Sequence, residues 1–169
     1  MANIYLERRE DALKRLKTAD HMLNVMYSSI NEPKILLATV ENIFLGLSSS
    51  IAALLYYELS LRRVPAFQDT FDAKYNLFKT RTGLKYGFDK SYFLLIEKVK
   101  DIVKRHNQSP VEFSRKSKFM ICDSDYGIEE LTKEKVNQYL DKSIDFYKIV
   151  HKIIDDDENI FGKRKLMKK

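Results

Sequence analysis

The chain lacks most of what several structural classes require. Its 169 residues include one cysteine, five glycines, three prolines and no tryptophan. One cysteine excludes an internal disulfide and a cysteine-cluster zinc site, and three scattered histidines offer no group of metal ligands. Few glycines and prolines argue against a sandwich or barrel, because such folds need many turns. Since no glycine-rich phosphate loop occurs either, we expect no metal and no cofactor.

The sequence is rich in apolar side chains at helical spacing. Hydrophobic residues make up 44% of the chain and aromatic residues 12%, which is enough for one folded domain. Long helices with short connections predict an all-α fold, an antiparallel helical bundle of about five helices. Apolar residues recurring every three or four positions place the helices over 5–30, 33–62, 67–79, 89–105 and 132–158.

Two connections between these helices have a distinctive composition. Thr80–Phe88 contains Gly83 and Gly87 and is expected to be a loop. Residues 107–131 contain a proline, a basic cluster and a short apolar run, which predicts a small hairpin-like excursion between the last two helices. Cys122 ends the apolar run, so we expect a buried small hydrophobic residue rather than a nucleophile.

The acidic segment that follows resembles a calcium-binding loop in length only. Asp123 to Glu134 covers twelve positions, but Ile128 stands where the loop requires glycine. We expect a turn with solvated acidic side chains there.

One uncharged segment is long enough to raise the question of a membrane span. Residues 42–57 carry no charge, but a span needs about 20 apolar residues and this segment includes three serines. Because the N-terminus also lacks a secretory signal, we expect a buried core helix, no membrane partner and a cytoplasmic location. Small residues every fourth position predict close approach of a neighbouring helix: Ala38, Asn42, Gly46 and Ser50.

The net charge of +6 is unevenly distributed along the chain. Residues 62–118 carry a net charge of +8, and residues 119–161 carry −6. The last eight residues, 162–169, hold five basic side chains and no acidic one. We therefore expect residues 1–158 to form a single bundle domain and residues 159–169 to form a basic, disordered C-terminal tail.

Two interpretations of the basic middle segment remain open. Its cations form a surface for a polyanion, of which RNA is favoured, or they pair with the acidic region inside the fold. Tyr86 and Phe113 lie among these cations, where an exposed ring can stack on a base. The candidate RNA-binding residues of the segment and the tail are Arg62, Arg63, Lys79, Arg81, Lys85, Lys104, Arg105, Arg115, Lys116, Lys118, Lys163, Arg164, Lys165, Lys168 and Lys169.

The order of the predicted helices resembles the HEPN-like helical bundles, which are small archaeal and bacterial domains often linked to RNA biology. The resemblance rests on Leu16–Leu23, on the apolar helix Glu41–Glu58, and on Ser109–Phe113 followed by residues 126–150. Over residues 1–155 the chain looks like uncharacterised archaeal proteins of this type. The resemblance implies an RNA-associated domain. In active members it implies a ribonuclease whose motif is an arginine, four to six residues, and a histidine.

Arg15 and His21 are the formal match to that motif in this chain. Six residues advance about 600° along a helix, so the two side chains are expected about 120° apart. We therefore expect a non-catalytic module that binds RNA or an RNA-containing assembly such as the ribosome. One alternative is a metal-independent ribonuclease that uses Arg15 and His21 as a homodimer. The other is a protein-binding or oligomeric scaffold.

Overall fold

The computed structural model describes the backbone of residues 4–167 and the side chains of residues 4–160. Its first element is one helical rod made of α1 (Ile4–His21), a π-helical turn η1 (Met22–Met26) and α2 (Tyr27–Ile30). The Tyr27 N–H donates to the Met22 carbonyl in this turn. Asn31 ends the rod in the left-handed conformation, with φ of 56°. The predicted helix over 5–30 is confirmed.

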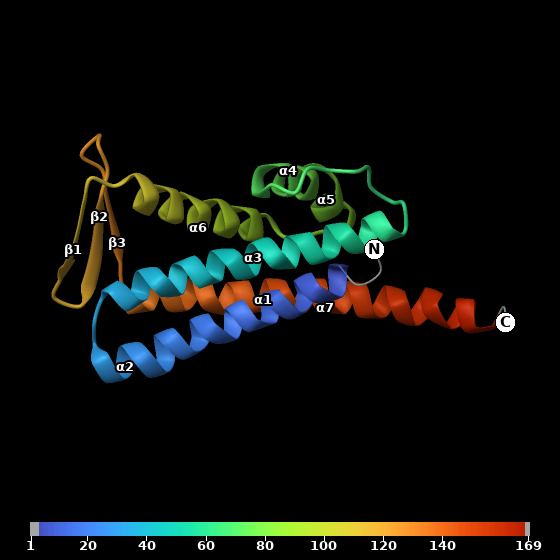
Figure 1. Cartoon of the computed structure of the whole chain (residues 1–169), viewed down its shortest axis with the longest axis horizontal. Helices are drawn as coiled ribbons and strands as arrows, with labels where there is room; N and C mark the ends of the chain where they lie inside the picture. The colour runs from blue at the N-terminus through green and yellow to red at the C-terminus, as the bar shows by residue number, and fades with distance from the viewer. Residues whose placement is uncertain (1–3, 168–169) are drawn as a thin grey trace.

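The central element is α3 (Lys34–Ser60), which packs against α1, α6 and α7 (Figure 1). Among the described residues it is the one helix long and apolar enough to cross a membrane, and its most apolar stretch of 18 residues has a mean hydropathy of 1.6. Of the residues in that stretch, 61% are buried inside the fold, as expected of a core helix. Its small-residue stripe does admit a neighbour, because a Cβ built on Gly46 would lie 2.8 Å from Leu16 Cγ of α1.

The next helical segment begins four residues later than the predicted helix over 67–79 and ends six residues later. It consists of α4 (Phe71–Leu77), a π-helical turn η2 (Phe78–Thr82) and α5 (Gly83–Lys85). The prediction of a loop over Thr80–Phe88 is therefore wrong for its first six residues. A Cβ on Gly83 would lie 2.7 Å from Phe93 Cζ, so this glycine allows close packing within a helix and does not break it.

The last two helices each begin at a capping side chain. Asp89 accepts a hydrogen bond from the Ser91 N–H before α6 (Lys90–Gln108), and Thr132 Oγ1 accepts one from the Lys135 N–H before α7 (Lys133–Met167). Helical backbone continues beyond residue 158 into the segment expected to form the disordered tail. The candidate binding side chains of that tail lie outside the described residues: Lys163, Arg164, Lys165, Lys168 and Lys169.

Between α6 and α7 lies a small antiparallel sheet at one end of the bundle (Figure 1). It has three strands in the order β1 (Val111–Arg115), β2 (Lys118–Cys122) and β3 (Ile128–Leu131), one strand more than a hairpin. Phe119 and Ile121 are buried against the bundle. Cys122 lies on the opposite face of β2 from Phe119 and Ile121 and is partly exposed. The prediction that Cys122 is buried is therefore wrong.

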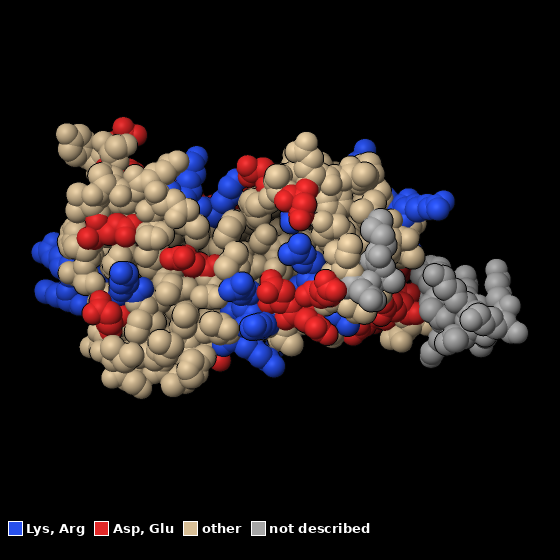
Figure 2. Space-filling view, viewed as in Figure 1, with Lys and Arg blue, Asp and Glu red and all other residues tan. Residues whose placement is uncertain are grey.

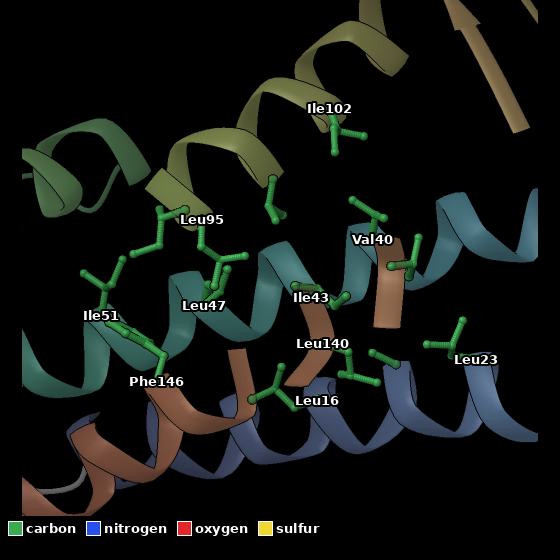
Figure 3. Packing of buried hydrophobic residues seen from close by; sticks show 14 of the residues in the cluster. Leu16, Leu23, Val40, Ile43, Leu47, Ile51, Leu95, Ile102, Leu140 and Phe146 are labelled. Atoms are coloured by element: carbon green, nitrogen blue, oxygen red, sulfur yellow. The ribbon is translucent and has the colours of Figure 1, made fainter. Parts of the chain in front are cut away.

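The core runs along α3, where side chains from every long helix meet (Figure 3). Leu16 of α1, Leu47 of α3, Ile102 of α6 and Leu140 and Phe146 of α7 are each 3% exposed or less. Burying a side chain of this size contributes roughly 1.5–3 kcal/mol. The predicted all-α helical bundle is thus confirmed, with a three-stranded sheet at the place of the expected hairpin-like excursion.

Candidate nucleic-acid interface

Half of the ten basic side chains predicted to bind RNA in the body of the chain are held by acidic residues. Three of the five partners belong to the acidic region 119–161, which confirms the expected compensation for Arg63, Arg105 and Lys118; the partners of Lys79 and Lys85 lie elsewhere in the chain. The pairs are Arg63 Nη1 with Asp157 at 2.9 Å, Lys79 Nζ with Glu97 at 2.7 Å, Lys85 Nζ with Glu58 at 2.7 Å, Arg105 Nη1 with Asp123 at 3.0 Å, and Lys118 with Glu130.

Glu58 is the centre of the most buried of these groups. Its side chain is 1% exposed and interacts with Arg63 and Lys85, and it accepts a hydrogen bond from the Tyr86 hydroxyl. Burial, followed by that hydrogen bond, raises the pKa of Tyr86 well above its ordinary value. Lys85 Nζ also lies 4.9 Å from the centre of the Tyr86 ring. Tyr86 is therefore a structural residue of the bundle and not a free stacking surface.

The other five basic side chains are exposed, and the described residues provide no ion pair for them. Three belong to different segments of the chain: Arg62 after α3, Arg81 on η2 and Lys104 on α6. Arg115 and Lys116 are adjacent, at the turn between β1 and β2. In Figure 2 basic side chains project from the sheet end of the molecule, whereas acidic and basic side chains intermingle along the middle.

Lys116 occupies a strained position in this turn. Its φ is 56°, in the left-handed region that favours glycine or asparagine. Tyr27 of α2 contacts this turn, because its hydroxyl donates a hydrogen bond to the Ser117 carbonyl at 3.3 Å. The fold thus presents the lysine to solvent despite a local backbone cost.

The strands next to this turn expose a face that carries an aromatic ring. Alternate residues of β1 share one side of the sheet, so Phe113 lies between Val111 and Arg115. Phe113 is 42% exposed, Val111 53% and Ile128 of β3 61%. We call this side the outer sheet face and define it by Val111, Phe113, Arg115, Lys118, Met120, Cys122, Ile128 and Glu130.

The opposite end of the outer sheet face is acidic. One carboxylate oxygen of Asp123 accepts hydrogen bonds from the N–H groups of Asp125 and Gly127, at 3.0 and 2.7 Å, and the other interacts with Arg105. The carboxylate therefore stabilises the β2–β3 turn. Within residues 4–160, no group of three or more His, Cys, Asp or Glu side chains is arranged to hold a metal ion.

Arg15 and His21 are not brought together within one chain. Both lie on the uninterrupted helix α1. Arg15 Nε lies 3.6 Å from Asp11, which accepts a hydrogen bond from Ser49 of α3. His21 is exposed and lines a shallow depression on α1 together with Glu10, Leu13, Lys14, Lys17 and Thr18, a set that does not include Arg15. This separation agrees with the angle expected from helical geometry.

Sequence reasoning identified part of this candidate surface. It named Phe113, Arg115, Lys116 and Lys118, but it did not identify Val111 and Ile128 as exposed apolar neighbours. The signal for Val111 was the alternation within residues 111–115, where every second side chain shares a face.

Comparisons with protein-family models, curated proteins and solved structures give no match to this chain. The resemblance to HEPN-like bundles therefore stays a prediction. The class that the fold defines is a mainly helical bundle with a small antiparallel sheet at one end.

Proposed function

We propose that this chain is a non-catalytic module that binds RNA, free or within an RNA-containing assembly, through the outer sheet face and the β1–β2 turn. One observation carries the proposal: Phe113 is 42% exposed on the same face as Arg115, and Lys116 follows at the turn. Stacking of a base on an aromatic ring is worth about 1–3 kcal/mol. Basic side chains beside the ring bind phosphates and release counterions.

The spacing of these groups suits a single strand of RNA. Phe113 and Arg115 are two positions apart on β1, which corresponds to about 7 Å. An unpaired RNA strand presents bases and phosphates to a protein side by side, and its splayed bases are the usual target of stacking residues. The ring and the guanidinium can therefore contact the same nucleotide or adjacent nucleotides.

Lys118 adds a third cation to this surface. Its pair with Glu130 is a surface pair, with the two side chains 48% and 35% exposed. Exposed pairs of this kind contribute little to stability, so a phosphate can replace the carboxylate at little cost. Lys85 differs, because its partner Glu58 is buried and would lose a charged hydrogen bond.

A binding experiment with single substitutions tests this surface. Fluorescence anisotropy of labelled single-stranded RNA at low salt should show that Phe113→Ala weakens binding by about 5- to 150-fold, the equivalent of one lost stacking contact. Lys116→Gly should also weaken binding, and it relieves the strained φ at the same time.

Arg62→Gly is the matched control. Arg62 is also exposed and basic, and its φ of 58° is nearly that of Lys116, but it lies outside the proposed surface. Its replacement should leave the affinity close to that of the unsubstituted chain. Equal losses for Lys116→Gly and Arg62→Gly, or unchanged binding by Phe113→Ala, would overturn the proposal. RNA recovered after incubation should be intact, since cleavage abolished by His21→Ala would favour the ribonuclease alternative.

A further inference from the structure

Within residues 4–167, no strand pairs with the outer edge of β1. β1 is the first strand in the order β1-β2-β3, and four of its five residues are exposed. Figure 1 shows no element beyond this edge. β1 contains no internal proline or bulge. In many proteins these features prevent an edge strand from pairing with another chain.

The register shows which backbone groups face outward at this edge. Arg115 and Lys118 flank a two-residue turn, so they exchange hydrogen bonds, as do Phe113 with Met120 and Val111 with Cys122. The alternate residues Glu112 and Ser114 therefore direct their N–H and C=O groups away from β2. No other described element donates to or accepts from these backbone groups.

We propose that β1 pairs antiparallel with β1 of a second copy of this chain, about a two-fold axis at Phe113. In this register Glu112 lies opposite the partner's Ser114, and Ser114 lies opposite the partner's Glu112. Every outward N–H and C=O group of the two strands is then paired. The two sheets become one antiparallel sheet of six strands.

Two neighbouring registers are less favourable. An axis at Glu112 would set the Glu112 carboxylates of both copies directly opposite each other, which is destabilising. An axis at Ser114 would leave Glu112 facing Lys116, which lies in the turn outside the strand and has a positive φ. The axis at Phe113 avoids both conflicts and adds a cross-strand pair of aromatic rings.

The charges along the sheet also complement each other in this arrangement. The β1–β2 end of each sheet carries Arg115 and Lys116, and the β2–β3 end carries Asp123 and Asp125. Antiparallel pairing brings the basic end of one copy beside the acidic end of the other. Parallel pairing would put like charges together.

Pairing at the edge leaves the outer sheet face open. The two Phe113 rings lie next to each other on one surface, flanked by the cations of both copies. This last consequence rests on the proposed RNA binding, whereas the pairing itself does not.

The association state of the full chain without RNA tests the pairing. Sedimentation velocity should show a dimer whose population rises with concentration. Ser114→Pro removes one outward N–H and no bond to β2, and it should weaken the dimer at least tenfold. Ser114→Ala keeps the N–H and should dimerise normally. Far-UV circular dichroism of Ser114→Pro checks that the fold is retained.

Disulfide trapping tests the register. In a Cys122→Ser background, Phe113→Cys should form a cross-linked dimer, because residues opposite each other in a non-hydrogen-bonded pair have Cα atoms about 4.5 Å apart. Val111→Cys should not cross-link, because Val111 lies opposite the partner's Arg115. A chain that stays monomeric at the highest concentration it tolerates, or equal cross-linking at both positions, would overturn the proposal. Because RNA is absent, the result does not depend on whether the chain binds RNA.

Discussion

Lys85 Nζ lies 2.7 Å from the carboxylate of Glu58, although the Glu58 side chain is 1% exposed and the lysine is 47% exposed. Arg63 Nη1 lies 3.3 Å from the same carboxylate. The two cations belong to different segments, one just after α3 and the other in α5. A single buried acid thus ties the end of the central helix to the helical segment packed beside it.

Replacing this acid should destabilise the fold. We expect Glu58→Gln to lower the free energy of unfolding by about 1–3 kcal/mol, because a buried charged acceptor with three partners is lost. Urea denaturation measures the change. Glu130→Gln is the matched control, since its pair with Lys118 is exposed and its loss should lower the free energy of unfolding much less than Glu58→Gln.

The close contact between α1 and α3 predicts a second effect on stability. Gly46→Val should cost about 1–3 kcal/mol, because the added side chain overlaps Leu16 at the helix crossing. Leu45→Val places the same residue type one position away, where the native side chain is 40% exposed, and should cost less. Thermal denaturation of both variants compares them, and equal losses would contradict the steric explanation.

The carboxylate of Glu97 predicts a dependence of stability on pH. Hydrogen bonds donated by Lys79 and Tyr75 hold the pKa of Glu97 below its ordinary value of 4.5. The ionised carboxylate therefore stabilises the fold above about pH 4.5, and this contribution is lost as the pH falls through the lower, folded-state pKa. Glu97→Gln should lose stability at neutral pH and approach the unsubstituted chain in acid. Urea midpoints at several pH values measure this, with the exposed Glu10→Gln as a control for the loss of one charge.

The salt dependence of RNA affinity should distinguish the contributions of the two basic regions that the sequence predicts to contact RNA. Each phosphate contact to a single strand contributes about 0.7 to the slope of log affinity against log salt concentration. Lys116→Gly should lower that slope by about 0.7, and deletion of residues 162–169, which hold five basic side chains, by up to about 3.5. Arg62→Gly should leave it unchanged. A slope unaffected by the deletion would assign all phosphate contacts to the body of the chain.

Much of the fold follows from local sequence patterns. The helix caps Asp89 and Thr132 were predictable because their side chains bond to N–H groups two or three residues away. The helical segment through Gly83 could not be predicted in this way, because Gly83 is required there by the close approach of Phe93, which lies ten residues later in the chain. Low helix propensity at glycine was overridden there by tertiary packing.

The candidate site was predictable to a smaller degree. Arg63 and Arg115 look alike in sequence, but Arg63 forms an ion pair with Asp157, which is 94 residues away, and Arg115 forms no ion pair among the described residues. Ion pairs between distant segments follow from the packing of whole helices, which no local pattern encodes. The exposure of Phe113 likewise depends on which side of the sheet faces the bundle.

The length of α7 determines how long a ligand must be to contact both basic regions. The helix begins directly after β3 and contains 35 residues, about 52 Å from the sheet to its far end (Figure 1). If the proposed RNA binding and the predicted contact of the basic C-terminal segment both hold, a short oligonucleotide would occupy the sheet or the far end of the helix but would not reach both. Affinity should therefore rise in a step, not smoothly, once the RNA is long enough to bridge the two ends, because the second contact then becomes intramolecular.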